Sequence, residues 1–224
     1  MTTLLLVDDD ADLRLVLGVA LSDYGYRVVA SGDAESALYE FSAHAVDAVL
    51  VDIRLPGMSG LELCREIRRR GTTPLVAMTG LGLGDDIDAG FEAGADDYVI
   101  KPVRATDLAQ RIEATLTRHR SRAATPARLT AGDLVLDLPD GPVRWLGESI
   151  PVSGVEARLL AVLAEHPGMV RRREELLERV WGTDGFDDLA LVDRQLQRLG
   201  ARLTRGTHSP VIQPDAGSGY RLVL

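Results

Sequence analysis

The chain of 224 residues has one cysteine, one lysine and no long apolar run. The single Cys64 excludes an internal disulfide, which fits a reducing compartment. No stretch reaches the roughly 18 consecutive apolar residues of a membrane-spanning helix. The first residues, MTTLLLVDDD, turn acidic after a short apolar stretch and do not resemble a signal peptide. We therefore expect a cytoplasmic protein with no membrane partner.

The negative charge lies mostly in the first half of the chain. Residues 1–120 carry 20 acidic and 12 basic residues, a net charge of −8 out of a total of −9. This acidity argues against nucleic-acid binding by the first half. The second half is nearly neutral, so contact with DNA there requires a local basic stripe. The length fits one large domain or two ordinary ones.

The first half alternates between short apolar runs and helix-like segments. The runs cover 3–8, 26–30, 46–52, 74–79 and 97–102, and the helical segments lie near 11–24, 33–43, 59–70, 85–93 and 104–119. This pattern predicts an α/β domain over residues 1–120. We expect a flavodoxin-like, doubly wound sheet of five parallel strands in the order 2-1-3-4-5. Asp33 and Ser59 are expected N-caps.

The second half has a different organisation. Residues 119–130 lack apolar periodicity, and we place a linker at 121–128 within them. The remaining segment, 129–224, is expected to be an α+β domain. Its strands are predicted at 133–137, 142–146 and 149–152, its helices at 154–168, 172–181 and 188–205, and two terminal strands surround a Gly-rich turn. Ser153 and Glu156 predict a capping box.

Polar side chains follow four of the five predicted parallel strands. Asp8 and Asp9 end the first, Asp52 the third, Thr79 the fourth and Lys101 the fifth. Ligands bind open α/β sheets at the carboxyl ends of the strands, where strand order reverses. Three carboxylates in one crevice repel each other unless a cation joins them, and oxygen ligands alone suit Mg²⁺.

These five residues predict a phosphoryl-transfer site. Asp52 is the expected nucleophile, and Asp8 and Asp9 are expected to hold Mg²⁺. Lys101 and Thr79 would stabilise the phosphorylated product. An ammonium is a compact charge on a flexible stem, so it suits a crowded crevice better than a guanidinium does.

Each of these residues also has an ordinary structural interpretation. One Asp at a strand end is commonly a turn or cap residue, and one Lys is commonly on the surface. Five residues at corresponding strand ends are harder to explain in that way. The stretch GLGLGDD at 80–86 lacks the dinucleotide-binding spacing and follows the wrong strand, so we expect a mobile loop. Pro102 restricts the backbone after Lys101 and permits a cis bond. Cys64 is expected to be inert.

Four motifs in the first half, LLVDDD, VDIRLPGMSG, VAMTG and ADDYVIKP, together resemble a two-component receiver domain. The resemblance implies that Asp52 accepts a phosphoryl group from a histidine kinase. It also implies that the backbone carbonyl of Arg54 joins the Mg²⁺ shell. Thr79 and Tyr98 would form the switch pair, in which Thr79 moves toward the phosphoryl group and Tyr98 turns inward.

The helix predicted at 188–205 combines an apolar stripe with arginines on the other side. Val192, Leu196, Leu199 and Leu203 form the stripe. A helix of this kind suits a DNA major groove, and the alternative is a solvated charged face. The expected DNA contacts are Arg194, Gln195, Arg198, Arg202 and Arg205.

The segments LLAVLAEHPGMVRRREELLERVWG and GSGYRL resemble the winged-helix output domain of OmpR/PhoB-type response regulators. The resemblance implies that the helix at 188–205 recognises double-stranded DNA and that the hairpin at 210–223 is the wing. It further implies a homodimer formed through the fourth helix, fifth strand and fifth helix. The intersubunit ion pairs of the family are matched by Asp97 with Arg111 and Asp96 with Arg118.

Three positions depart from the family pattern. Gly200 stands inside the recognition helix where a basic residue is usual, Asp215 lies in the wing, and Ile87 replaces a lysine in the fourth helix. An alternative therefore stays open, a weak or phosphorylation-independent DNA-binding regulator or a protein-interaction module. A further alternative is an aspartyl-phosphate phosphohydrolase. It needs a second acid two residues after the nucleophile, where Arg54 stands, so we expect a regulator and no enzyme.

Overall fold

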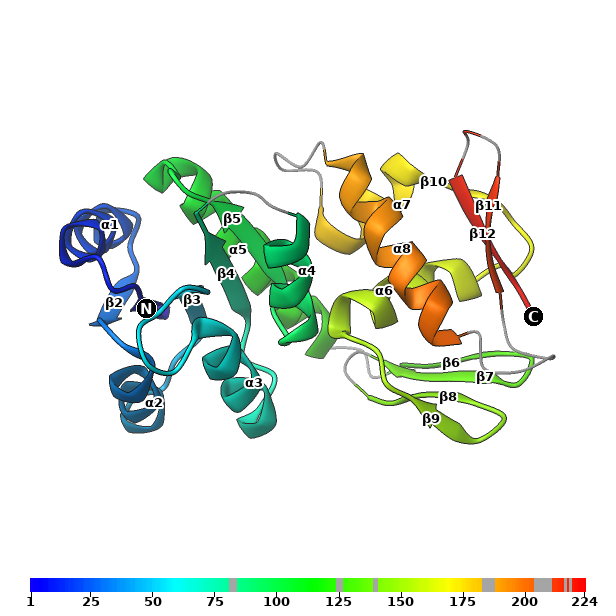
Figure 1. The fold of residues 1–224 in the computed structure, drawn as a ribbon, viewed down its shortest axis with the longest axis horizontal. Coiled ribbons are helices and arrows are strands. Elements are labelled where there is room, and N and C mark those ends of the chain that lie inside the picture. Colours follow the sequence, from blue (N-terminus) through cyan, green and yellow to red (C-terminus); the bar gives the residue numbers. More distant parts are fainter. Residues whose placement is uncertain are drawn as a thin grey trace. The chain divides into compact units, whose positions relative to one another are not determined.

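The computed structural model describes residues 1–80, 84–123, 127–138, 141–182, 188–203, 211–215, 217 and 219–224. The chain divides into two compact units, Met1–His119 and Arg120–Leu224 (Figure 1). No helix in the described ranges combines the length and apolar character needed to cross a bilayer. The loop expected at 80–86 lies partly outside the described residues, because 81–83 are not among them.

The first unit contains a five-stranded parallel sheet in the order β2-β1-β3-β4-β5, which confirms the predicted doubly wound architecture. Its strands are β1 (Thr3–Val7), β2 (Arg27–Ser31), β3 (Ala48–Asp52), β4 (Leu75–Thr79) and β5 (Asp97–Ile100). Its helices are α1 (Ala11–Asp23), α2 (Ala34–Ala43), α3 (Gly60–Arg70), α4 (Gly84–Glu92) and α5 (Ala105–Ala123). The carboxyl ends of β1 and β3 are neighbours in this order, as the crevice requires.

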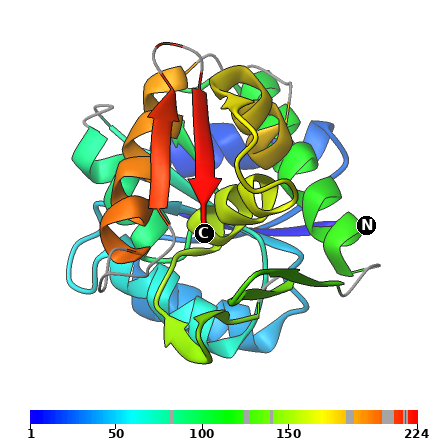
Figure 2. The same ribbon diagram turned by 90° about the vertical axis from the view of Figure 1, so that its right-hand side faces the viewer.

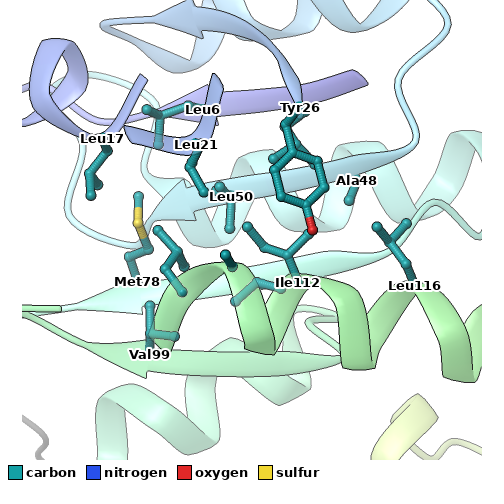
Figure 3. Close-up of a cluster of buried hydrophobic side chains, with 14 residues drawn as sticks. Leu6, Leu17, Leu21, Tyr26, Ala48, Leu50, Met78, Val99, Ile112 and Leu116 are labelled. Carbon is teal, nitrogen blue, oxygen red and sulfur yellow. The ribbon is translucent and has the colours of Figure 1, made fainter. Parts of the chain in front are cut away.

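The sheet is buried on both faces because its strands are apolar at nearly every position. Figure 3 shows one of the two cores, where strand residues such as Leu50 and Met78 meet Leu21 of α1 and Ile112 of α5. The other core packs α2 and α3 against the opposite face, around Leu63 and neighbouring side chains. Packing on both faces of the sheet therefore fixes the positions of the strand ends.

Local caps and one glycine fix the loops at the carboxyl end of the sheet. The side chains of Asp33 and Ser59 cap α2 and α3, as predicted. The side chain of Asp10 also caps α1, accepting from the backbone N–H groups at positions 12 and 13. A Cβ at Gly60 would lie 1.9 Å from the carbonyl oxygen of Asp52, so only glycine allows α3 to begin against the end of β3.

The second unit combines two antiparallel sheets with three helices. The first sheet has the order β6-β7-β8-β9 and the second the order β10-β12-β11. The strands are β6 (Ala127–Ala131), β7 (Leu134–Leu138), β8 (Val143–Trp145), β9 (Glu148–Ile150), β10 (Arg171–Arg172), β11 (Val211–Asp215) and β12 (Gly219–Val223). The helices are α6 (Gly154–Ala164), α7 (Arg173–Trp181) and α8 (Leu189–Leu203). The capping box of Ser153 and Glu156 begins α6, as predicted.

The predicted linker at 121–128 differs from the structure. Helix α5 continues to Ala123, because arginine and alanine are strong helix formers. Strand β6 begins at Ala127, and its Leu129 pairs with Leu136 of β7. Only residues 124–126 fall between the two elements, and they lie outside the described residues.

Helices α6, α7 and α8 bury their apolar faces against each other, and the β11–β12 hairpin lies beside α8 (Figure 2). The hairpin and the three helices occupy the order that the sequence predicted. The two turn positions 216 and 218 lie outside the described residues.

Candidate functional site

Three carboxylates gather at the carboxyl ends of β1 and β3. Carboxylate oxygens of Asp8, Asp9 and Asp52 lie within 4.8 Å of one another. Asp8 is 0% exposed and Asp52 is 7% exposed, whereas Asp9 faces solvent. Charges this close and this buried repel each other strongly. A donor set made only of carboxylate oxygens fits a hard divalent cation such as Mg²⁺.

Lys101 lies between two of these carboxylates. Its Nζ donates to Asp8 Oδ2 at 2.5 Å and also to Asp52 Oδ2, and the peptide bond to Pro102 is cis. Burial acts to lower the pKa of Lys101, but the hydrogen bonds and charges of Asp52 and Asp8 outweigh it, so the pKa is raised. The ammonium therefore stays charged at neutral pH and joins β5 to β1 and β3.

Thr79 and Tyr98 lie on the neighbouring strands β4 and β5. Thr79 is buried, and its Oγ1 has no hydrogen-bond partner among the described residues. A buried hydroxyl without a partner costs about 1–3 kcal/mol, so this oxygen is available to a ligand. Tyr98 is buried and packs edge-on against Phe91 of α4, with 5.8 Å between ring centroids. Its side chain therefore already faces inward.

Two arginines hold the loops that carry the carboxylates. The backbone N–H of Arg54 donates to Asp52 Oδ1 at 2.7 Å, and its guanidinium binds Asp86 Oδ2 on α4 at 2.7 Å. Arg14 of α1 donates to the carbonyl oxygen of Asp8 at 2.6 Å. Sequence reasoning missed Arg14 and Asp86, because no local pattern marks a contact that depends on how helices pack on the sheet.

The proposed dimer-face residues form ion pairs within the chain. Asp97 is buried and binds Arg111 at 3.2 Å and Arg118 at 3.0 Å, both on α5. Asp96 binds Arg68 of α3 at 2.9 Å. The resemblance pairs Arg118 with Asp96 of a second copy, and that intersubunit pair stays a prediction. Because Arg111 and Arg118 are two helical turns apart on α5, both reach the same strand residue, Asp97.

Helix α1 presents an apolar surface that sequence reasoning did not identify. Leu15, Val16 and Val19 are 67%, 63% and 59% exposed. The helix begins immediately after the carboxylates of Asp8 and Asp9, so this surface adjoins the crevice. The sequence does contain a signal for this surface, because apolar residues lie on nearly every side of the helix. A helix with a single buried face needs fewer apolar residues.

Helix α8 buries a wider face than predicted. The buried residues are Leu191, Val192, Gln195, Leu196, Leu199 and Leu203. Gln195 is only 2% exposed, so its predicted contact with DNA would require this side chain to become exposed. Arg198 is half-buried, and Arg205 lies outside the described residues. The three described arginines, Arg194, Arg198 and Arg202, are therefore each only partly exposed.

Two of the predicted DNA-contacting arginines are held within the second unit. Arg202 Nε lies 3.0 Å from Oε1 of the buried Glu156, and its Nη1 donates to the carbonyl of Pro151 at 3.4 Å. Arg194 lies 3.5 Å from Asp188. Arg202 therefore joins α8 to the start of α6, and its contact with DNA stays a prediction.

A second network joins α7, α8 and the wing. Oδ1 of Asp193 accepts from Arg173 Nε at 2.7 Å and from the Tyr220 hydroxyl at 2.7 Å. The Arg173 guanidinium also lies 6.0 Å from the centre of the Tyr220 ring. Burial, with a further effect of Asp193, raises the pKa of Tyr220. Sequence reasoning missed this network, which fixes β12 against α8.

The fold and the crevice define a receiver domain followed by a winged-helix domain. The family described as response regulator receiver domain matches residues 4–113, and the family described as transcriptional regulatory protein, C terminal, matches residues 147–222. The chain is 37% identical over 223 residues to transcriptional regulatory protein AfsQ1 of Streptomyces coelicolor, covering 99% of this chain and 98% of that protein.

DNA-binding response regulator MtrA of Mycobacterium tuberculosis is 36% identical over 219 residues, covering 97% of this chain and 95% of the relative. The chain therefore belongs to the two-component response regulators of the OmpR/PhoB type, and it is a transcription-regulating response regulator. This confirms the resemblance drawn from its motifs.

Solved structures agree with this fold. A RitR variant superposes with a TM-score of 0.72 at 24% identity and covers 99% of both chains, which supports the fold alone. DrrB, a Thermotoga maritima OmpR/PhoB homolog, has a TM-score of 0.52 at 30% identity and covers 100% of this chain and 99% of its own. The predicted fold class is confirmed.

Proposed function

We propose that Asp52 accepts a phosphoryl group from a sensor histidine kinase and that the phosphorylated chain dimerises on promoter DNA. The observation that carries the proposal is the crevice itself. It combines a nucleophilic carboxylate, a charged ammonium and a buried hydroxyl that has no partner among the described residues. These are the groups that phosphoryl transfer to a carboxylate requires.

Asp8, Asp9 and Asp52, with the backbone carbonyl of Arg54, would hold Mg²⁺ in this crevice. When bound, the ion neutralises charge on the phosphoryl oxygens. The carboxylate oxygens already lie within 4.8 Å of one another, so little rearrangement is needed to share one ion.

Asp52 carries out the transfer. Its carboxylate oxygen attacks the phosphorus of phosphohistidine, the new O–P bond forms, and the N–P electron pair returns to the imidazole. Lys101 then exchanges its bond to the Asp52 carboxylate for one to a phosphoryl oxygen, which its flexible stem permits. The Thr79 hydroxyl donates to another phosphoryl oxygen and so gains its missing partner.

The added charge of about −1.5 to −2 biases two conformations of the first unit. Movement of Thr79 toward the phosphoryl group pulls on β4, and the buried Tyr98 transmits the change to α4 through Phe91. The face formed by α4, β5 and α5 then associates with a second copy. Asp97 supports that face by holding α5 on β5. A dimer would place two α8 helices on half-sites about one DNA turn apart.

The exposed residues Leu15, Val16 and Val19 are the proposed contact for the kinase, because they adjoin the crevice that must meet the phosphohistidine. A cytoplasmic location follows from the proposed DNA target. Relatives that match nearly the whole chain include proteins named DNA-binding response regulators, which does not favour an interaction module without DNA.

The proposal is tested by measuring association and DNA binding before and after treatment with Mg²⁺ and a small phosphodonor. We expect sedimentation to show a shift toward a dimer, and binding of promoter fragments to become tighter. Binding should weaken steeply as salt rises, since phosphate contacts release counterions. No salt-dependent binding to any DNA, with or without phosphodonor, would contradict the output role.

A further inference from the structure

The fully exposed residues of α8 form an outward line and carry no charge. Its exposed described residues are Ala190, Gln197 and Ala201, which are separated by seven and four residues and so lie on one side of the helix. Gly200 lies next to this line, and a Cβ added there would meet nothing within 4 Å. The fully exposed side chains of α8 therefore offer one amide and two methyl groups, and a glycine lies beside them.

The charged side chains beside this line are engaged within the unit. Arg202 is bound to Glu156, Arg194 lies in the row of Ala190 and Gln197 but 3.5 Å from Asp188, and Arg198 is half-buried. Asp193 is the single acidic residue of α8, and its carboxylate accepts from both Arg173 and Tyr220. Neither a cation nor an unsatisfied carboxylate therefore dominates the outward line.

This chemistry matches one kind of base-pair edge. A glutamine amide donates and accepts at once, so it pairs with N6 and N7 of adenine in the major groove, and an alanine methyl contacts the thymine methyl group. Guanine is read chiefly by arginine or lysine, and none of the three fully exposed residues is either. Gly200 permits closer approach of the helix backbone to the groove. Gln197 and Ala201 are one turn apart, about 6 Å along the axis, which places them over nearby base pairs.

We propose that α8 reads adenine and thymine through Gln197 and Ala201, and that the salt-dependent phosphate contacts come from outside this line. The inference rests on the proposed DNA-binding function and specifies its target as a half-site containing A·T pairs. Gly200, where the family usually has a basic residue, then belongs to the surface that reads DNA. In place of a charged contact it allows the helix backbone to lie closer to the bases.

The test is selection of bound fragments from a random DNA pool by the full-length chain, treated with Mg²⁺ and phosphodonor. The unchanged chain should select a half-site with a strong adenine preference at one position. Gln197→Ala should lose discrimination at that position by about 5- to 150-fold while keeping its non-specific binding. Gln197→Glu should move the preference toward cytosine, whose N4 donates to a carboxylate. Ser149→Ala, exposed on β9, is the matched control and should select the unchanged half-site.

Two further results separate the possible failures. Gly200→Arg should steepen the slope of log affinity against log salt by about one, and it should weaken the adenine preference because its side chain prevents the close approach. If both Gln197 variants select the original half-site with undiminished discrimination, the inference is overturned although DNA binding stands. If the unchanged chain enriches no sequence under any condition, the DNA-binding proposal fails and the inference fails with it. Matching thermal unfolding of each variant establishes that it is folded.

Discussion

Replacing Lys101 by methionine is expected to destabilise the first unit. Methionine keeps the length of the side chain but removes the ammonium that binds Asp8 at 2.5 Å and also binds Asp52. Asp8 is fully buried, so its carboxylate would stay in the crevice without this compensating charge. Breaking a buried ion pair by removing one partner typically costs about 3–5 kcal/mol. Because Asp9 faces solvent and the crevice is partly open, we expect the lower end, about 3 kcal/mol.

Chemical denaturation of Lys101→Met and of the unchanged chain measures this difference. In metal-free buffer the variant should unfold at a clearly lower denaturant concentration. Added Mg²⁺ should restore more stability to the variant than to the unchanged chain, because the ion takes over neutralisation of Asp8 and Asp52. Arg104→Met is the control, since Arg104 is exposed and pairs only locally with Asp107 in the described contacts. It should leave the midpoint unchanged.

The stability difference between Lys101→Met and the unchanged chain should depend on pH. The pKa of Lys101 is raised in the folded chain, so its stabilisation is complete below the unfolded value of about 10.4. It is lost as pH rises through the higher folded value. The difference between the two proteins should therefore be constant near neutral pH and shrink only in strongly alkaline solution. Equal stability at pH 7, with no difference in the response to Mg²⁺, would refute the argument that Lys101 compensates the carboxylates.

Three further predictions concern other contacts. Leu15→Glu should slow phosphoryl transfer from the kinase but not from a small phosphodonor. The control Tyr39→Glu, on the exposed side of α2, should change neither rate. Equal slowing with both donors would show that α1 does not contact the kinase. Burial raises the pKa of Cys64 to about 12, so the thiol of the native chain should resist alkylation at pH 8. Labelling of the native chain as fast as that of the denatured chain would contradict this expectation. Tyr220→Phe removes the hydrogen bond to Asp193 and should lower the unfolding free energy of the second unit by about 1.5 kcal/mol. An unchanged unfolding curve would show that the network contributes no stability.

The sheet and the crevice could be predicted because they depend on local patterns. Five apolar runs, each flanked by a helical segment, define a parallel sheet, and the ends of the runs place Asp8, Asp52 and Lys101 together. The single lysine of the chain was informative for the same reason, since it follows the fifth run. The positions of these residues at strand ends, combined with the expected order of the strands in the sheet, were enough to predict that they lie together.

Side-chain pairing between helices could not be predicted in the same way. The four apolar residues of α8 indicated a narrow buried stripe, but contact with α6 and α7 also buries Gln195 and turns Arg202 toward Glu156. Strand β6 was not predicted, because its few apolar residues are recognisable only once Leu129 pairs with β7. These features depend on which surfaces meet, and one sequence does not encode that locally.

Measuring the intact mass of the chain tests directly whether Asp52 receives the phosphoryl group. The chain is incubated with Mg²⁺ and a small phosphodonor, beside Asp52→Ala treated identically. We expect that the unchanged chain gains one phosphoryl group, that the gain requires Mg²⁺, and that Asp52→Ala gains none. Uptake of the same group by Asp52→Ala would contradict the account, because the acceptor would then lie elsewhere.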